Sequence, residues 1–595
     1  MSTQETSLIQ NATELQSTLL DSISLDVPWD IVERFSKIVR LSGTEEERQA
    51  IDLLRSRLSQ WGVPHTLHEP EAFISIPLSA SLRLEGANGE TLRAKTPAMS
   101  ISTDDGEVSA ELVYVPSVSS GDAPGDVFAT GVSFGGQAVT GKIVMTEGFA
   151  SPGKVNDVMA AGAAGGIFIN PGQAIHEGIC TTIWGTPDLD NQADQPSIPV
   201  IAINNPDGQK LIEAAKSGAR VAISTKLETG WRKIPVLVAE IPGAQVPDEF
   251  VLLHGHLDSW HEGVGDNATG DATMLELARV FWQQREHLAR SLKIAWWSGH
   301  SHGRYAGSTW FADEFGVELA KNCVAQVNCD SPGCRWAETY NELTAMSETV
   351  PFVDAVIKEI TSIAPQTERP PRAGDYSFNG IGLTGFYMLS STMSEELRTE
   401  KNYYAVGGCG ANIEWHTEGD TIEIADRDNL LRDMKVYAAS ILRVLNASVV
   451  PFDFRSTTRE FRDVLTTYQN AAGSAFDFGA SMKALDDLEA ALAEFYAAAP
   501  SGASPSDPVA RKFNFAQRRL ARLLVPVNYS RAEAFRHDPA LGVPQLPDLA
   551  PASSVSAADG DVAKLGILRA HLTRGQNRLV WALIQAREVV ESAQA

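Results

Sequence analysis

The sequence predicts an α/β fold: a mostly parallel mixed sheet flanked by helices, with a β-rich domain inserted into it and a helical domain after it. Three observations lead to this prediction. Continuous apolar segments alternate with a helical pattern between 235 and 330, short β-rich segments lie among glycines and prolines between 105 and 225, and amphipathic patterns fill the chain after 450. The chain of 595 residues is long enough for several domains.

The central segment carries the predicted sheet. It contains the apolar runs VLVAEIPG, EFVLLHGHLDSW, SLKIAWWSGH and NCVAQVNCDSPG, and the helical pattern GDATMLELARVFWQQREHL lies between two of them. Strands of a parallel sheet are buried on both faces and therefore read as continuous apolar runs. Two more amphipathic helices are expected between residues 29 and 62, the second beginning at Thr44 because Glu47 follows three residues later.

Changes in composition along the chain set the expected domain boundaries. Residues 1–75 and 232–447 should form the core, residues 76–231 the insert, and residues 448–595 the helical domain. The insert contains ELVYVP, GKIVMTEG, GGIFINP and IPVIAIN around one small-residue helix, which is typical of a compact β-rich module.

The composition excludes some classes of partner. The chain has 49 Lys and Arg against 75 Asp and Glu, a net charge of −26, so its surface should repel phosphate backbones and no nucleic-acid partner is expected. No apolar stretch approaches the roughly 20 residues of a membrane span, so no membrane association is expected. The N-terminal segment resembles no secretory signal, and the five cysteines show no zinc-finger or disulfide spacing; both favour a cytoplasmic protein.

Five polar residues lie where the predicted strands end. His256 and Asp258 follow EFVLL, Asp266 opens the next helix, Asp330 ends VAQVNCD, and His416 lies in the loop WHTEGDT. The carboxyl ends of parallel strands meet at one edge of a sheet, and imidazoles and carboxylates are metal ligands. We therefore expect a metal site at this edge. Asp258 is expected to orient the His256 ring by accepting its second N–H.

The order of these motifs, H-x-D-S-W, D-N-A-T-G, G-S-T-W, N-x-D-S-P-G and H-T-E-G-D-T, resembles the co-catalytic zinc exopeptidases, and among them the glutamate carboxypeptidase II and transferrin receptor group. The resemblance covers nearly the whole chain. It implies a zinc aminopeptidase-like core, a protease-associated insert, and a homodimer formed through the C-terminal helices. It also implies that His256 and Asp330 bind one metal, that Asp266 bridges two metals, and that His416 binds the second.

One loop departs from the family. The family carries a Glu-Glu pair after its third core strand, a general base followed by a metal ligand, whereas this chain reads WWSGHSHGRYAGSTW. Counting from the two sides places His300 at the base position and His302 at the ligand position, with an insertion near Ser301. We expect His302 to bind metal and His300 to act as base or to support a ligand. Glu262, in the turn before Asp266, is an alternative base.

These residues predict a metal-dependent hydrolase that cleaves an amide bond in a small peptide, an N-acyl amino acid or a non-peptide amide, with two divalent metal ions, expected to be zinc. Two alternatives stay open. A catalytically silent binding protein of transferrin-receptor type would bind little metal, and a single-metal acyl-transfer enzyme of glutaminyl-cyclase type would not hydrolyse. Weaker pocket candidates, each with a surface or packing role as the alternative, are Arg304, Tyr305, Arg372, Asp375, Lys401, Tyr403 and Tyr404.

Overall fold

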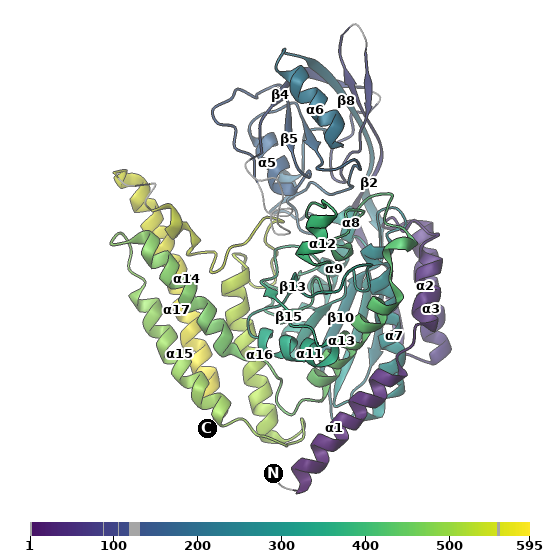
Figure 1. Ribbon diagram of the computed structural model, residues 1–595. Helices are drawn as coiled ribbons and strands as arrows, with labels where there is room; N and C mark the ends of the chain where they lie inside the picture. Colours follow the sequence, from purple (N-terminus) through teal and green to yellow (C-terminus); the bar gives the residue numbers. More distant parts are fainter. Residues whose placement is uncertain are drawn as a thin grey trace.

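The computed structural model describes residues 3–86, 89–104, 106–117, 131–555, 558 and 560–594. Two large sheets, a small two-stranded sheet and a set of long helices make up the described part of the molecule (Figure 1). The insert stands at one end of the core, and the C-terminal helices lie along one side of it. No helix in the described part of the chain is both long and apolar enough to cross a membrane.

The core sheet has six strands in the order β1-β9-β11-β10-β12-β15. The strand β10 is parallel to β11 and β12, and β12 is parallel to β15, whereas β1 and β9 are antiparallel to their neighbours. The predicted mostly parallel mixed sheet is therefore confirmed. Its strands are β1 (His65–His68), β9 (Val236–Ile241), β10 (Val246–His256), β11 (Arg290–Trp297), β12 (Cys323–Asn328) and β15 (Gly385–Phe386).

Helices cover both faces of this sheet because successive strand residues point to opposite sides. Val251 and Leu253 belong to the large apolar cluster of one face, whereas Phe250 and Leu252 belong to the cluster of the other. The first face packs against α1 (Thr3–Ser22), α2 (Asp26–Phe35), α3 (Glu45–Trp61), α7 (Thr269–Gln283), α11 (Val350–Thr361) and α13 (Arg427–Asn446). The other face packs against α9 (Ala306–Glu314) and α10 (Gly316–Asn322).

The helix predicted to begin at Thr44 does so. The Thr44 side chain accepts a hydrogen bond from the backbone N–H of Glu47 and caps α3. Short elements complete the core around the ends of the sheet: α8 (His300–Gly303), β13 (Leu343–Thr344), β14 (Thr367–Glu368) and α12 (Glu395–Glu400).

The insert is built on a long antiparallel pair of strands, β2 (Glu71–Leu84) and β8 (Arg220–Lys233), which leave the core and return to it. Its sheet has seven strands in the order β3-β2-β8-β4-β5-β6-β7. The remaining elements are β3 (Thr91–Arg93), β4 (Val108–Tyr114), β5 (Ile143–Glu147), α5 (Pro152–Ala160), β6 (Gly165–Ile169), β7 (Val200–Ile203) and α6 (Asn205–Ala215).

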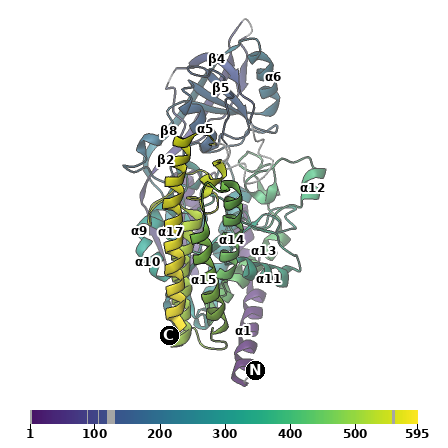
Figure 2. The ribbon, with the colours of Figure 1, turned by 90° about the vertical axis from the view of Figure 1, so that its left-hand side faces the viewer.

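The C-terminal part is helical, as predicted, and its long helices run side by side (Figure 2). They share an apolar core of their own that also receives Met346, Tyr376 and Met388 from the sheet domain. The helices are α14 (Phe454–Ala472), α15 (Gly479–Ala497), α16 (Pro508–Tyr529) and α17 (Val562–Gln594). All five cysteines of the chain are buried and free.

Candidate metal centre

The parallel register of the core sheet brings the carboxyl ends of three strands, β10, β11 and β12, together. In the ladders, His256 pairs with Trp297 at the end of β11, and His254 pairs with Asn328 at the end of β12. The segments that leave these three neighbouring strands therefore start at one edge of the sheet. His256 is the last residue of β10, Asp330 follows β12 by two residues, and α8 follows β11.

Four of the predicted ligands converge at this edge. Nε2 of His256 lies 2.9 Å from Oδ1 of Asp266 and 3.6 Å from Oδ2 of Asp330, and Nε2 of His416 lies 3.0 Å from Oδ2 of Asp266. Nε2 of His256 and Oδ1 of Asp266 are buried, and neither has a hydrogen-bond partner in the described residues. Both atoms are thus available to a shared cation, and Asp266 offers a second oxygen on the side of His416.

The electrostatics of this group suit a cation. Burial alone would lower the pKa of His256, but the neighbouring carboxylates of Asp266 and Asp330 outweigh burial and raise it well above its usual value. Burial would raise the pKa of Asp266, but His256 and His416 hold it well below its usual range. In the absence of a metal, the cluster therefore attracts a proton to His256, where a divalent ion would supply the positive charge.

Sequence reasoning missed two residues that hold the Asp266 turn. The carboxylate of Asp420 accepts hydrogen bonds from the backbone N–H groups of Gly265, at 2.6 Å, and Asp266, at 3.0 Å. The side chain of Asn267 donates to the backbone carbonyl of Cys329 at 2.9 Å and ties the turn to the end of β12. The signals were present in the motifs DNATG and HTEGDT, but a short polar residue in a loop does not reveal its partner.

Asp258 acts on the cluster differently from the prediction. The nearest oxygen to Nδ1 of His256 is the backbone carbonyl of Asp258, at 2.8 Å, whereas the carboxylate of Asp258 lies 4.0 Å away. The carboxylate instead accepts hydrogen bonds from the backbone N–H groups of His300, at 3.1 Å, and Ser301, at 2.8 Å, and from the hydroxyl of Ser42. Asp258 therefore fixes the start of α8, and its main chain orients His256.

The two histidines of the unusual loop point in different directions. The ring of His300 stacks on the ring of His256 with their centroids 3.8 Å apart, and a nitrogen of His300 lies within 4.8 Å of ligand atoms of both His256 and Asp330. His302 lies outside this group. Its Nδ1 is 2.9 Å from the Ser42 hydroxyl, and its ring packs on Trp260.

His302 therefore does not belong to the donor group around His256, although its Nε2 is buried and has no hydrogen-bond partner in the described residues, so its role as a ligand stays a prediction. The prediction assumed that both histidines face the site, but they share the single turn α8, where residues two apart point in nearly opposite directions. Ser301, between them, lines the same pocket as Asp266 and His416. Of the three residues His300, Ser301 and His302, the pocket lining contains the first two, and Ser301 carries a hydroxyl.

A buried carboxylate orients His300. Nδ1 of His300 donates to Oδ2 of Asp375 at 2.8 Å, and the hydroxyl of Ser308 donates to Oδ1 of Asp375 at 2.7 Å. Burial would raise the pKa of Asp375, but the adjacent His300 lowers it, so this carboxyl is ionised. The hydrogen bond fixes the Nδ1–H tautomer of a neutral His300 and leaves Nε2 as the acceptor atom.

Glu262 does not join the centre. It is absent from both the donor group and the pocket lining of the described residues, and its backbone carbonyl accepts from Arg40 at 2.8 Å. The adjacent His261 points to the insert, where its Nε2 lies 3.2 Å from a carboxylate oxygen of Glu177. The structure thus offers no support for Glu262 as the base.

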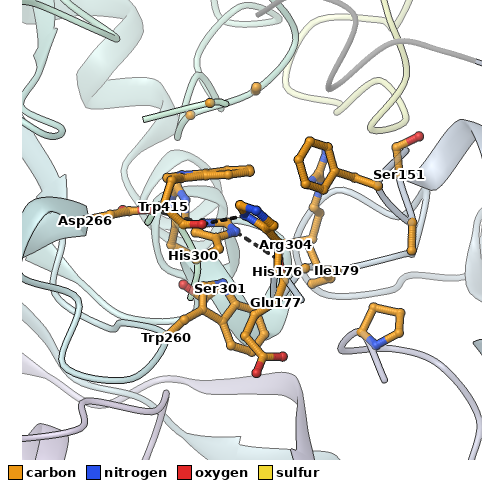
Figure 3. A pocket seen from close by; sticks show the side chains of 18 of the residues that line it. Ser151, His176, Glu177, Ile179, Trp260, Asp266, His300, Ser301, Arg304 and Trp415 are labelled. Carbon is orange, nitrogen blue, oxygen red and sulfur yellow. Dashed lines mark hydrogen bonds and ion pairs between the residues drawn. The ribbon is translucent and has the colours of Figure 1, made fainter. Parts of the chain in front are cut away.

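The centre opens into a pocket that the core and the insert build together (Figure 3). The insert supplies Ser151, His176, Glu177 and Ile179 to the lining. The backbone carbonyl of Glu177 lies 3.1 Å from Nδ1 of His416, so the insert touches one of the predicted ligands directly.

The weaker candidates divide between the pocket and the surrounding structure. Arg304 and Tyr305 line the pocket. The hydroxyl of Tyr404 lies 2.7 Å from Nε2 of His176 behind the lining, and the guanidinium of Arg372 donates to the backbone carbonyls of Tyr376 and Asp538. Lys401 and Tyr403 are not among the lining residues, and the Lys401 ammonium lies over the ring of Trp336.

The core thus presents imidazoles and carboxylates at the carboxyl edge of a mostly parallel sheet, beside a β-rich insert, which is an arrangement suited to a metal-dependent enzyme. Residues 237–441 match Peptidase family M28, and residues 108–211 match the PA domain. The core of the chain therefore contains a region that matches the peptidase M28 family, and the insert matches a PA domain, which confirms the resemblance seen in the motifs.

Known proteins resemble parts of this chain. Aminopeptidase NAALADL1 of Mus musculus is 31% identical over 155 residues, which are 25% of this chain and 19% of the mouse protein. Carboxypeptidase Q of Xenopus laevis is 26% identical over 310 residues, 49% of this chain and 60% of the frog protein. An aminopeptidase from Aneurinibacillus sp. strain AM-1 shares the fold, with a TM-score of 0.53 at 17% identity over 72% of this chain and 95% of its own. The chain thus matches about a fifth of the length of the mouse relative.

Proposed function

We propose that this protein is a zinc-dependent hydrolase that cleaves an amide bond in a small substrate, such as a short peptide, an N-acyl amino acid or another amide. The observation that carries this proposal is the convergence of His256, Asp266 and Asp330, in which Nε2 of His256 and Oδ1 of Asp266 are buried without hydrogen-bond partners in the described residues. A histidine with two carboxylates fits zinc in a site that keeps a position open for substrate. The names of the M28 relatives, which are aminopeptidases and carboxypeptidases, support the reaction class.

We propose two metal positions of unequal affinity. His256, Asp330 and one oxygen of Asp266 would hold the first ion, with His300 next to them. The other oxygen of Asp266 and His416 would hold the second, and Ser301 offers only a hydroxyl there. A neutral hydroxyl is a much weaker zinc ligand than a carboxylate or an imidazole, so the second ion should dissociate first.

The residues of the pocket suggest how the reaction is performed. Zinc, when bound, supplies Lewis-acid polarisation of the amide carbonyl. His300 would accept the proton of the attacking water at Nε2, because Asp375 fixes the proton of the ring at Nδ1 and stabilises the imidazolium that forms. The same proton can then pass from Nε2 to the leaving nitrogen. A His–Asp pair thus takes the place of the family's glutamate base.

Metal analysis and a substrate panel test this proposal. Protein purified without chelators should contain between one and two zinc ions per chain and should hydrolyse at least one member of a panel of dipeptides and N-acetyl amino acids. Less than 0.1 zinc per chain, with no gain after incubation with zinc, would favour a silent binding protein. One zinc with cyclisation of N-terminal glutamine peptides and no hydrolysis would favour the acyl-transfer alternative.

The homodimer through the C-terminal helices is also a proposal. Four large apolar side chains on α16 and α17 are more than half exposed: Phe515 at 57% on α16, and Val562 at 84%, Ile567 at 71% and Trp581 at 59% on α17. Exposed apolar side chains on neighbouring helices are typical of an association surface. Light scattering should give twice the monomer mass, and Trp581→Glu should shift it to the monomer.

We also propose a cytoplasmic location, which the spacing of the cysteines favours.

A further inference from the structure

Arg304 is a buried cation without a partner in the catalytic pocket. It directly follows α8, is only 6% exposed, and lines the same pocket as His300 and Asp330 (Figure 3). Nε and Nη2 of its guanidinium are buried and make no hydrogen bond, and the described residues place no carboxylate in an ion pair with it. The ring of Tyr305 lies beside it, 5.0 Å from the guanidinium carbon.

Other buried arginines of the chain are paired. Arg40 donates from three nitrogens to backbone carbonyls, Arg290 forms an ion pair with Glu249 at 2.9 Å, and Arg372 donates to two backbone carbonyls. Burying a guanidinium without such partners is unfavourable, since the charge loses its hydration and gains nothing in return. The fold therefore leaves at Arg304 a strong donor that a bound molecule can satisfy.

The carboxylates that line the pocket are not available to Arg304. Glu177 is paired with Lys95 at 3.0 Å and with His261 at 3.2 Å. Asp266 and Asp330 face His256 in the predicted metal group. The anion that completes Arg304 must therefore come from the ligand.

We propose that Arg304 binds a carboxylate of the substrate and so restricts the enzyme to small amides that carry one, such as N-acyl amino acids or dipeptides with a free carboxyl end. A guanidinium matches a carboxylate through two parallel hydrogen bonds, and these are strongest where water is excluded. The left-handed backbone of Arg304, with φ of 48°, and the hydrogen bond from Gly185 N–H to its carbonyl at 2.7 Å hold the residue in place. This inference rests on the proposed hydrolase function.

A comparison of charged and neutral substrates tests the proposal. The carboxylate substrate that is cleaved fastest and its carboxamide are compared in the wild type, Arg304→Met and Arg304→Lys, with Arg536→Met, an exposed arginine outside the pocket, as the matched control. We expect the wild type and R536M to prefer the carboxylate by about 100-fold in kcat/KM. R304M should lose this preference, mainly through KM, and R304K should retain part of it.

A binding measurement separates the two proposals. Calorimetry with the carboxylate product and its amide should show tighter binding of the carboxylate to zinc-loaded wild type and equal binding to R304M. Binding discrimination without hydrolysis of any substrate would overturn the hydrolase and leave the carboxylate site standing. Equal use of both substrates by the wild type, or a preference that survives in R304M, would overturn the Arg304 proposal alone. Zinc content and melting temperature of each variant show whether it is folded, and R304K replaces R304M if the latter is not.

Discussion

Replacing Asp375 with Asn is the sharpest test of the His–Asp pair. The substitution keeps the size of a side chain that is 1% exposed, and Asn tolerates the left-handed φ of 54° at this position. It removes the charge that faces His300 at 2.8 Å. A buried hydrogen bond to a charged group contributes about 1.5–3 kcal/mol, which corresponds to about 10- to 100-fold in a rate or an affinity.

We therefore expect Asp375→Asn to lower kcat/KM by about 10- to 100-fold, with the melting temperature changed by only a few degrees. Steady-state kinetics on the best panel substrate and zinc content by mass spectrometry measure the effect. Ser308→Ala is the matched control, because it removes a hydroxyl bonded to the other oxygen of the same carboxylate and should cost less than about fivefold. A D375N enzyme within twofold of the wild type in both readouts would refute the role given to the pair.

Three further predictions concern other parts of the molecule. His302→Ala should keep its zinc content and lose about 1–3 kcal/mol of stability, because it removes a buried ring that packs on Trp260 and one of the two side-chain partners of the Ser42 hydroxyl; loss of zinc would restore His302 as a ligand. His416→Ala should lose the second zinc while the first remains, as equilibrium dialysis would show; loss of both ions would contradict the two positions. Glu348→Gln should stabilise the protein at pH 8 relative to the wild type and leave it nearly unchanged at pH 4. Burial raises the pKa of Glu348 from 4.5 to about 7, so the wild type loses about 3 kcal/mol of stability as pH rises from 4.5 to 7. Urea unfolding of both proteins at several pH values measures this loss. Equal pH dependence of the two proteins would contradict the prediction.

The fold was predictable because its signals are local. Apolar runs that end in polar residues, as at His256 and Asp330, predict buried strands, and their alternation with a helical pattern predicts a mostly parallel sheet. The parallel order also places those exits at one edge, so most of the donor group followed from the sequence. The changes in composition that distinguish the insert and the C-terminal helices from the core are likewise local properties of the sequence.

The details of the α8 loop were not predictable. Whether His300 or His302 faces the site depends on the rotation of one helical turn, which Asp258 sets through hydrogen bonds to the backbone N–H groups of His300 and Ser301. Asp375 lies 75 residues beyond its partner His300, and no spacing rule connects them. Contacts of this kind arise from the tertiary fold and leave no periodic trace in the sequence.

The contact between Glu177 and His416 has a consequence for the insert. The Glu177 backbone carbonyl lies 3.1 Å from the His416 ring, and its N–H donates to the His416 carbonyl at 2.8 Å. Thermodynamic linkage makes this contact reciprocal. If docking of the insert raises the affinity of His416 for an ion, binding of that ion strengthens the docking of the insert on the core by the same factor. In the proposed two-metal centre, ion binding at His416 and docking of the insert would therefore be coupled equilibria.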